Sequence, residues 1–464
     1  MDARPTLATA RHAGRPDRSP NRMALVAAMV GVAVVTLDIS LTSTALPAIA
    51  RGLGVAPATA VWLVNIYYLA VVAALLPLAA LGESYWQRRI FLLGLAAFAA
   101  GSLASGLAPS LPALMAARAL VGMGAAAVSA TTPALIRALY PPERMGRGLG
   151  LYALVVGVAF TAGPPAASAV LAVADWPWLY FQNALLALLA LALAIRGLPE
   201  TERFVRRFDL AASLLCSLGF AALLFAVAGT AHLTAPPLLA ALALFVLSAG
   251  LLLKRETGHP APILGADLFR RPLFALASLT AIFAFSVQGL VFVALPFLFQ
   301  TKLGFTQVEA GLLIMPWPAT LIVMTMIAAR LAERVPPGLL AGLGLLLLAA
   351  GLVLLARLPA GADDVAIGGR LVFCGVGFGL FQSPNMAALM RSAPPARSGS
   401  AGGILAMSRL FGQSLGAAVV AYWLAARPAD GVETAIWSAA AFACIGAAVS
   451  LARLLPAVRR GGGA

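Results

Sequence analysis

Fourteen long apolar stretches, separated by short polar segments, occupy most of this 464-residue chain. Each stretch is about 19 to 28 residues long, and a helix of that length crosses the roughly 30 Å hydrocarbon core of a bilayer. Hydrophobic residues make up 61% of the chain and charged residues only 11%, which leaves too little polar side chain to cover a water-facing surface. The sequence therefore predicts an all-α integral membrane protein with fourteen transmembrane helices. The predicted helices are 23–47, 60–81, 89–107, 111–137, 148–173, 178–197, 209–229, 236–254, 273–298, 307–331, 337–357, 364–390, 399–425 and 433–456.

The net charge of +15 would suggest nucleic-acid binding in a soluble protein, but the positions of the cations indicate membrane topology instead. With the N-terminus inside, 25 of the 32 Lys and Arg residues fall in cytoplasmic segments and four fall outside. The other three, Arg118, Arg370 and Arg409, fall within predicted helices. This asymmetry follows the positive-inside rule. We therefore expect a multi-pass protein of the plasma (bacterial inner) membrane, with both termini cytoplasmic and no nucleic-acid partner.

The loops divide the predicted helices into two sets of six and a central pair. Residues 23–197 are expected to form an N-terminal six-helix bundle, and residues 273–456 a C-terminal six-helix bundle. Residues 198–272 hold cytoplasmic linker segments and two additional transmembrane helices with few polar side chains, so we expect this pair to face lipid. Residues 1–22 form a basic cytoplasmic arm and residues 457–464 a cytoplasmic tail, both predicted to be disordered.

Two matched features suggest that the six-helix sets are repeats of one another. Glu83 ends the second predicted helix as Glu333 ends the tenth, and Arg118 and Arg370 each enter a helix shortly before a run of glycines. In many membrane proteins built from two repeated halves, a binding site lies near the bilayer midplane between two gates, one on each side of the membrane. The alternative is that helices rich in alanine and glycine resemble one another by composition alone.

Asp38 is the only acidic residue near the middle of a predicted helix, where a carboxylate costs about 2.5–3.5 kcal/mol to insert. Hydroxyl side chains follow it, so this part of the helix must face protein or a wet cavity. The first helix rises from the cytoplasm and the fourth descends, which places Asp38 and Arg118 at similar depth. We predict that the two residues pair and that the carboxylate couples to protons. A carboxylate held by a structural arginine is the alternative.

Other polar residues and helix breakers within the spans are candidates for a pathway through the membrane. Gly157 and the Gly163-Pro164 step permit close backbone approach and a kink in the fifth predicted helix. The possible substrate contacts are Thr42, Gln288, Gln382, Asn385, Arg409 and Gln413. Hydrogen bonds that hold neighbouring helices together are an equal alternative for the amide side chains.

The sequence offers no enzyme signature. The three histidines are scattered through the arm and loops, and the three cysteines lie inside predicted helices. Neither a metal cluster nor a catalytic triad is therefore expected. A phosphate-binding G-x-x-x-x-G-K-[ST] loop is also missing from the sequence. We expect no enzymatic activity, no cofactor and no metal.

Taken together, these motifs resemble those of the fourteen-helix drug/proton antiporters of the major facilitator superfamily. Residues 37–47 match the helix-one signature of that family, and residues 78–89 resemble its loop motif between helices two and three. Residues 118–124 are similar to the helix-four motif, with Val121 in place of its glutamine. The antiporter motif of helix five is matched from Gly157 to Pro164.

The resemblance implies a major facilitator fold of two six-helix bundles plus two extra central helices, with Asp38 in the proton pathway and Arg118 in proton transfer. The residues implied in gating or conformational change are Glu83, Arg88, Arg89, Gly157, Gly163, Pro164 and Glu333. We interpret the chain as a proton-coupled secondary transporter, favouring efflux by antiport of amphipathic or drug-like small molecules through alternating access. Its expected partners are a small-molecule substrate, protons and the lipid bilayer, and we expect a monomer. A proton-coupled importer or symporter of a small metabolite is the alternative, and a non-transporting membrane sensor or scaffold a remote one.

Overall fold

Every regular element of the computed structural model is helical within the residues that it describes, which are 22–85, 87–140, 145–199, 209–229, 234–256, 266–359, 361–394 and 398–455. Fourteen helices in this part of the chain are long and apolar enough to cross a membrane, so the predicted all-α architecture is confirmed. The predicted arm, apart from Arg22, and the predicted tail 457–464 lie outside the described residues.

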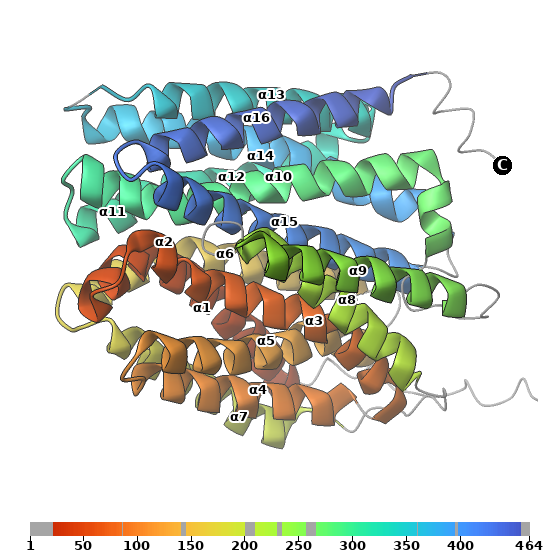
Figure 1. Cartoon of the computed structure of the whole chain (residues 1–464). Coiled ribbons are helices and arrows are strands. Elements are labelled where there is room, and N and C mark those ends of the chain that lie inside the picture. Colours follow the sequence, from red (N-terminus) through yellow and green to blue (C-terminus); the bar gives the residue numbers. More distant parts are fainter. Residues whose placement is uncertain are drawn as a thin grey trace, which may run out of the picture.

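The helices form two groups that occupy the lower and upper halves of Figure 1, with α8 and α9 packed on each other between them. The first group contains α1 (Arg22–Leu53), α2 (Pro57–Ala60), α3 (Trp62–Tyr85), α4 (Gln87–Gly106), α5 (Leu111–Leu139), α6 (Met145–Leu171) and α7 (Pro177–Gly197). The central pair is α8 (Leu210–Gly229) and α9 (Ala235–Glu256). The second group contains η2 (Ala266–Arg270), α10 (Pro272–Phe297), η3 (Leu298–Lys302), α11 (Gln307–Ile314), α12 (Pro316–Leu331), α13 (Pro337–Ala356), α14 (Asp364–Ser392), α15 (Ser398–Ala426) and α16 (Gly431–Ala452). The exact domain boundaries stay a prediction.

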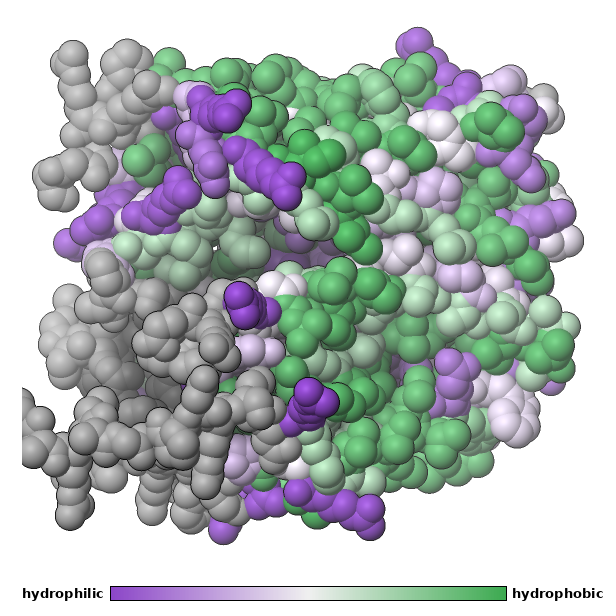
Figure 2. Space-filling view, turned by 180° about the vertical axis from the view of Figure 1, so that it is seen from behind, coloured by the Kyte–Doolittle hydropathy of each residue, from purple (hydrophilic) through white to green (hydrophobic). Residues whose placement is uncertain are grey.

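The surface has the character expected of a protein in lipid. Green apolar residues cover most of the middle of the face in Figure 2, and purple hydrophilic residues gather chiefly toward its ends. Helix α9 is the least covered span and exposes Leu239, Val246 and Leu247, as predicted for an added helix that faces lipid. We call the end at which α1 begins and α16 ends the basic end, because Arg22, Arg137, Arg196, Arg391 and Arg453 lie there, and the opposite end the far end.

Helix α1 is longer than its sequence suggests. The predicted helix 23–47 ends at Pro47, but α1 continues to Leu53. A proline removes one backbone hydrogen bond, and neighbouring helices can satisfy the freed groups, so a membrane helix tolerates it. The helix ends instead where Gly54 adopts a positive φ of 63°, a conformation that glycine reaches without strain.

Matched glycines support the repeat between the halves. A Cβ atom on Gly124 of α5 would lie 2.6 Å from the carbonyl of Gly94 in α4, and one on Gly377 of α14 would lie 2.6 Å from the carbonyl of Gly344 in α13. Close contact of this kind lets two membrane helices pack backbone to backbone. The same two helix pairs therefore pack in the same way in both halves.

The match also corrects the pairing of two arginines. Gly122 of α5 packs on the Tyr67 carbonyl of α3 as Gly375 of α14 packs on the Trp317 carbonyl of α12. In that register the counterpart of Arg118 is Leu371, which is fully buried. Arg370 is one residue earlier and so points about 100° away around its helix.

Candidate functional site

The centre of the first half holds a buried ion pair between α1 and α5. Nη1 of Arg118 donates a 2.9 Å hydrogen bond to Oδ1 of Asp38, and Nη2 lies 2.8 Å from Oδ2. Both side chains are fully inaccessible to solvent. The contact predicted from helix direction and depth is therefore present, and it neutralises two charges that neither lipid nor an apolar core would accept alone.

A third helix completes the cluster. Nδ2 of Asn183 on α7 donates a 2.8 Å hydrogen bond to the same Oδ1 of Asp38. The other oxygen, Oδ2, lies 2.8 Å from Nη2 of Arg118, so both carboxylate oxygens face this one guanidinium. Protonation of either oxygen therefore requires the ion pair to open.

Aromatic rings flank the arginine. The guanidinium carbon of Arg118 lies 4.9 Å from the ring centre of Tyr67 on α3 and 5.5 Å from that of Tyr180 on α7. Ring faces attract a cation at this distance, and more strongly where water is absent. Thr42, a predicted pathway residue, is buried beside Tyr180 one turn beyond Asp38. Four helices of the first half therefore converge on this one cluster.

Helix α6 is fastened to α1 next to the cluster. The ring nitrogen of Pro164 cannot donate a hydrogen bond, so the carbonyl of Phe160 one turn earlier loses its helical partner. The Ser40 hydroxyl of α1 donates a 2.9 Å hydrogen bond to that carbonyl. Gly163 permits the approach, because a Cβ atom there would lie 2.3 Å from the Ser40 oxygen. The predicted glycine and proline thus form a contact with the helix that carries Asp38.

The two halves touch at the far end through α1 and α6. Ser168 of α6 donates a 2.8 Å hydrogen bond to the carbonyl of Gln307, at the start of α11. The Gln307 amide in turn reaches the Thr44 carbonyl of α1 at 3.5 Å. Gly157 lies nearer the basic end of α6 than Ser168 does. It packs against Ile322 of α12, and a Cβ atom on Gly157 would lie 3.0 Å from the isoleucine side chain.

The predicted pathway amides of the second half bond to neighbouring helices. Nε2 of Gln413 on α15 donates a 3.0 Å hydrogen bond to Oε1 of Gln288 on α10, and Nδ2 of Asn385 on α14 donates to the Ala277 carbonyl of α10 at 3.1 Å. These contacts hold helices together. Gln382 and Arg409 are partly buried, and α15, which carries Arg409, packs against α3 of the first half.

The predicted gating residues of the loops lie at the basic end, apart from the Asp38 cluster. Nη2 of Arg88 donates a 2.7 Å hydrogen bond to the Ile195 carbonyl, which the last turn of α7 leaves without a helical donor. Arg89 is exposed, and Glu333 is exposed just after α12. Glu83 lies in α3, but its side chain is outside the described residues. No group of His, Cys, Asp and Glu able to hold a metal ion occurs in the described part of the chain.

Sequence reasoning missed Asn183, Tyr67, Tyr180 and Ser40 as members of the cluster. Asn183 and Tyr180 had a signal, since both fall in the aromatic segment 176–183 that begins α7. Tyr67 had none, because nothing in the sequence of α3 indicates which of its faces meets Arg118.

Comparison with known proteins gives a consistent result. The sequence model of the Major Facilitator Superfamily matches residues 28–417. The chain is 41% identical over 434 residues to the "Uncharacterized transporter YebQ" of Escherichia coli (strain K12), covering 93% of this chain and 95% of that protein. It is 32% identical over 430 residues to the "Multidrug resistance protein Stp" of Mycobacterium tuberculosis (strain CDC 1551 / Oshkosh), covering 89% and 78%. A crystal structure of the peptide transporter POT in complex with sulfate has the same fold, with a TM-score of 0.73 at 15% identity over 95% of this chain and 96% of that one.

Proposed function

The chain belongs to the Major Facilitator Superfamily, a family of transporters, and from that membership we propose that it is a proton-coupled antiporter that exports amphipathic or drug-like small molecules. It is a multi-pass membrane protein whose relatives move small molecules across membranes. The observation that carries the proposal is the buried cluster of Asp38, Arg118 and Asn183. A scaffold would gain nothing from an ion pair that costs so much to bury.

Protonation of the Asp38 carboxylate is the proposed coupling step. Protonation removes the negative charge that balances Arg118 and leaves a buried cation whose partner is lost, a state that costs about 3–5 kcal/mol. The rings of Tyr67 and Tyr180 offset part of that cost. The remainder favours a rearrangement of α1, α5 and α7, which all hold the cluster. Release of the proton on the other side restores the pair.

Alternating access requires that contacts at one end open while those at the other close. The proposed orientation places the basic end and both termini on the cytoplasmic side of the bacterial inner membrane, in accord with the positive-inside rule. The far-end contacts of Ser168 and Gln307 would then close the outward side. Because Ser40 joins α1 to the kink of α6, movement of the Asp38 cluster would reach this gate.

The proposed direction is export, supported by the likeness to a multidrug resistance protein at 32% identity. Import by symport is the alternative, and the experiment must distinguish it from export. Everted inner-membrane vesicles from cells expressing the protein would be acidified inside and given fluorescent amphiphiles of cationic, neutral or anionic charge. Export predicts that at least one probe accumulates in the vesicles and escapes when an uncoupler collapses the pH gradient. Loss of preloaded probe from the vesicles on acidification would indicate import and refute the proposal.

A further inference from the structure

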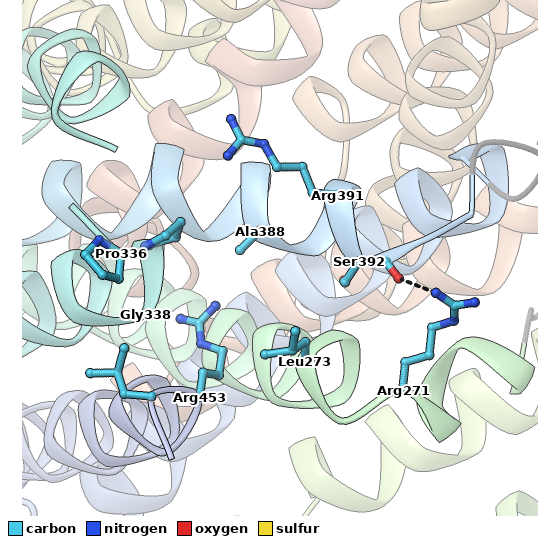
Figure 3. A pocket seen from close by; sticks show the side chains of 10 residues that line it. Arg271, Leu273, Pro336, Gly338, Ala388, Arg391, Ser392 and Arg453 are labelled. Carbon is cyan, nitrogen blue, oxygen red and sulfur yellow. Dashed lines mark hydrogen bonds between the residues drawn. The ribbon is translucent and has the colours of Figure 1, made fainter. Parts of the chain in front are cut away.

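A cavity of about 510 Å³ lies at the basic end of the second half, apart from the Asp38 cluster. Figure 3 shows it between the start of α10 at Leu273, the start of α13 at Gly338, the last turns of α14 at Ala388, and Arg453, which follows α16. Cavities of this size are large enough for a small ligand.

The lining is strongly cationic. Within the described part of the chain it includes Arg271, Arg391 and Arg453 and no carboxylate. Helices α10 and α13 both begin at the cavity, with prolines at their first positions, and the start of a helix carries partial positive charge. The Arg453 guanidinium and two helix starts therefore border a space whose described lining includes no carboxylate.

Arg453 is the residue that indicates a missing ligand. Its side chain is only 4% exposed, and its Nε and Nη2 atoms bond to Ser450, which in turn donates a 2.9 Å hydrogen bond to the Gly338 carbonyl. The third nitrogen, Nη1, is buried and has no hydrogen-bond partner among the described residues. The guanidinium points into the cavity toward Ala388 (Figure 3).

The charge on Arg453 persists at neutral pH. Burial lowers the pKa of its guanidinium to about 10, so the group is protonated at pH 7. A buried donor that lacks a partner costs about 1–3 kcal/mol, and more when it is charged. An anion in the cavity would remove that cost.

The structure assigns this cavity to a phosphate group, held by Nη1 of Arg453 with Arg271 at the rim. Arginine binds phosphate through several charge-assisted hydrogen bonds, and the partial positive charge at a helix start also favours an anion. Arg271 donates a 3.4 Å hydrogen bond to the Ser392 carbonyl, and Arg391 points away from Arg453 in Figure 3, so Arg453 supplies the guanidinium that faces the cavity. The apolar side chains of Leu273 and Leu454 line the same space, which suits the headgroup of an anionic phospholipid. Free phosphate shares the recognising chemistry and is the second source to test.

Thermal melting of the purified full-length protein in detergent tests the site. Phosphatidylglycerol should raise the melting temperature of the wild type, whereas phosphatidylcholine of the same acyl chains should not, because a ligand that binds only the folded state stabilises it. In Arg453→Gln the phosphatidylglycerol concentration for half-maximal effect should rise at least about tenfold. Arg334→Gln, an exposed arginine at the same end that does not line the cavity, is the matched control and should respond as the wild type does.

A second variant keeps the test valid if Arg453→Gln fails to fold. Ala388→Asp places a carboxylate in the cavity opposite Arg453 and should abolish the lipid effect while retaining the arginine. Stabilisation by inorganic phosphate, at matched ionic strength with chloride, would support the phosphate site and identify a soluble anion as its occupant. Equal responses to both lipids, equal responses in all four proteins, or no response of the wild type to either lipid or phosphate would overturn the assignment.

Discussion

Ser40 of α1 donates a 2.9 Å hydrogen bond to the Phe160 carbonyl of α6, the one carbonyl that Pro164 leaves without a helical donor. Asp38 lies two residues before Ser40 on the same helix. The kink in α6 is therefore not an isolated irregularity, because its free carbonyl is bound by the helix that carries the buried carboxylate. We propose that movement at Asp38 is transmitted to α6 through this bond.

Gly163→Ala should lower both stability and transport. The new methyl group would lie 2.3 Å from the Ser40 oxygen and would force α1 and α6 apart. Overpacking of this kind costs about 1–3 kcal/mol. Gly150→Ala on the same helix is the control, since a Cβ atom there meets nothing within 4 Å. Melting temperatures and vesicle transport check the prediction, and identical behaviour of the two variants would contradict the close contact.

Asn183→Leu should reduce gradient-driven transport by about tenfold. The substitution removes a hydrogen bond to the ionised carboxylate of Asp38, worth about 1.5 kcal/mol for a charged acceptor. Gln182→Leu is the matched control, because the adjacent position points about 100° away around α7. Vesicle transport rates and melting temperatures of the two variants check the prediction. A fall in stability with the transport rate unchanged would assign Asn183 a structural role only.

Gln288 and Gln413 should behave as a coupled pair that holds α10 against α15. A double-mutant cycle with Gln288→Leu and Gln413→Leu should give a coupling energy of about 0.6 kcal/mol, with about 1.7 as an upper bound. Unfolding of the purified protein measures the cycle. Strict additivity of the two single changes would show that the bond contributes nothing.

The ion pair of Asp209 and Arg255 joins α8 to α9 at the basic end, with Nε of Arg255 2.9 Å from Oδ2. Hydrogen bonds from Arg255 and from the Ala212 N–H lower the pKa of the Asp209 carboxyl. Because the folded-state pKa is lowered, the stabilisation is present above the ordinary value of about 3.9 and is lost as pH falls through the folded value. Arg255→Gln should therefore reduce the melting temperature slightly at pH 7. The difference from the wild type should be constant between pH 5 and pH 8 and should shrink below pH 4, and a difference that grows there would contradict the assignment.

Much of the architecture follows from the sequence because each membrane helix must be long, apolar and internally hydrogen-bonded. The Asp38–Arg118 contact was also predictable, since helix direction fixes the depth of both residues. Rotation about the helix axis was not predictable from one sequence. That is why Tyr67 was missed, and why Gln288 and Gln413 stayed open between substrate contact and helix packing. Arg370 was matched to Arg118 by the nearby glycines, although it is one residue out of register.

Flux measurements in proteoliposomes test whether Asp38 couples transport to protons. Wild-type and Asp38→Asn proteins would be reconstituted in proteoliposomes with a fluorescent amphiphile that the wild type carries, and flux would be recorded with and without an imposed pH gradient. Asparagine keeps the size of the side chain but cannot exchange a proton. The Asp38→Asn protein should lose gradient-driven flux yet still exchange substrate down the substrate's own gradient. Gradient-driven flux in Asp38→Asn equal to that of the wild type would contradict the proton-coupling role of Asp38.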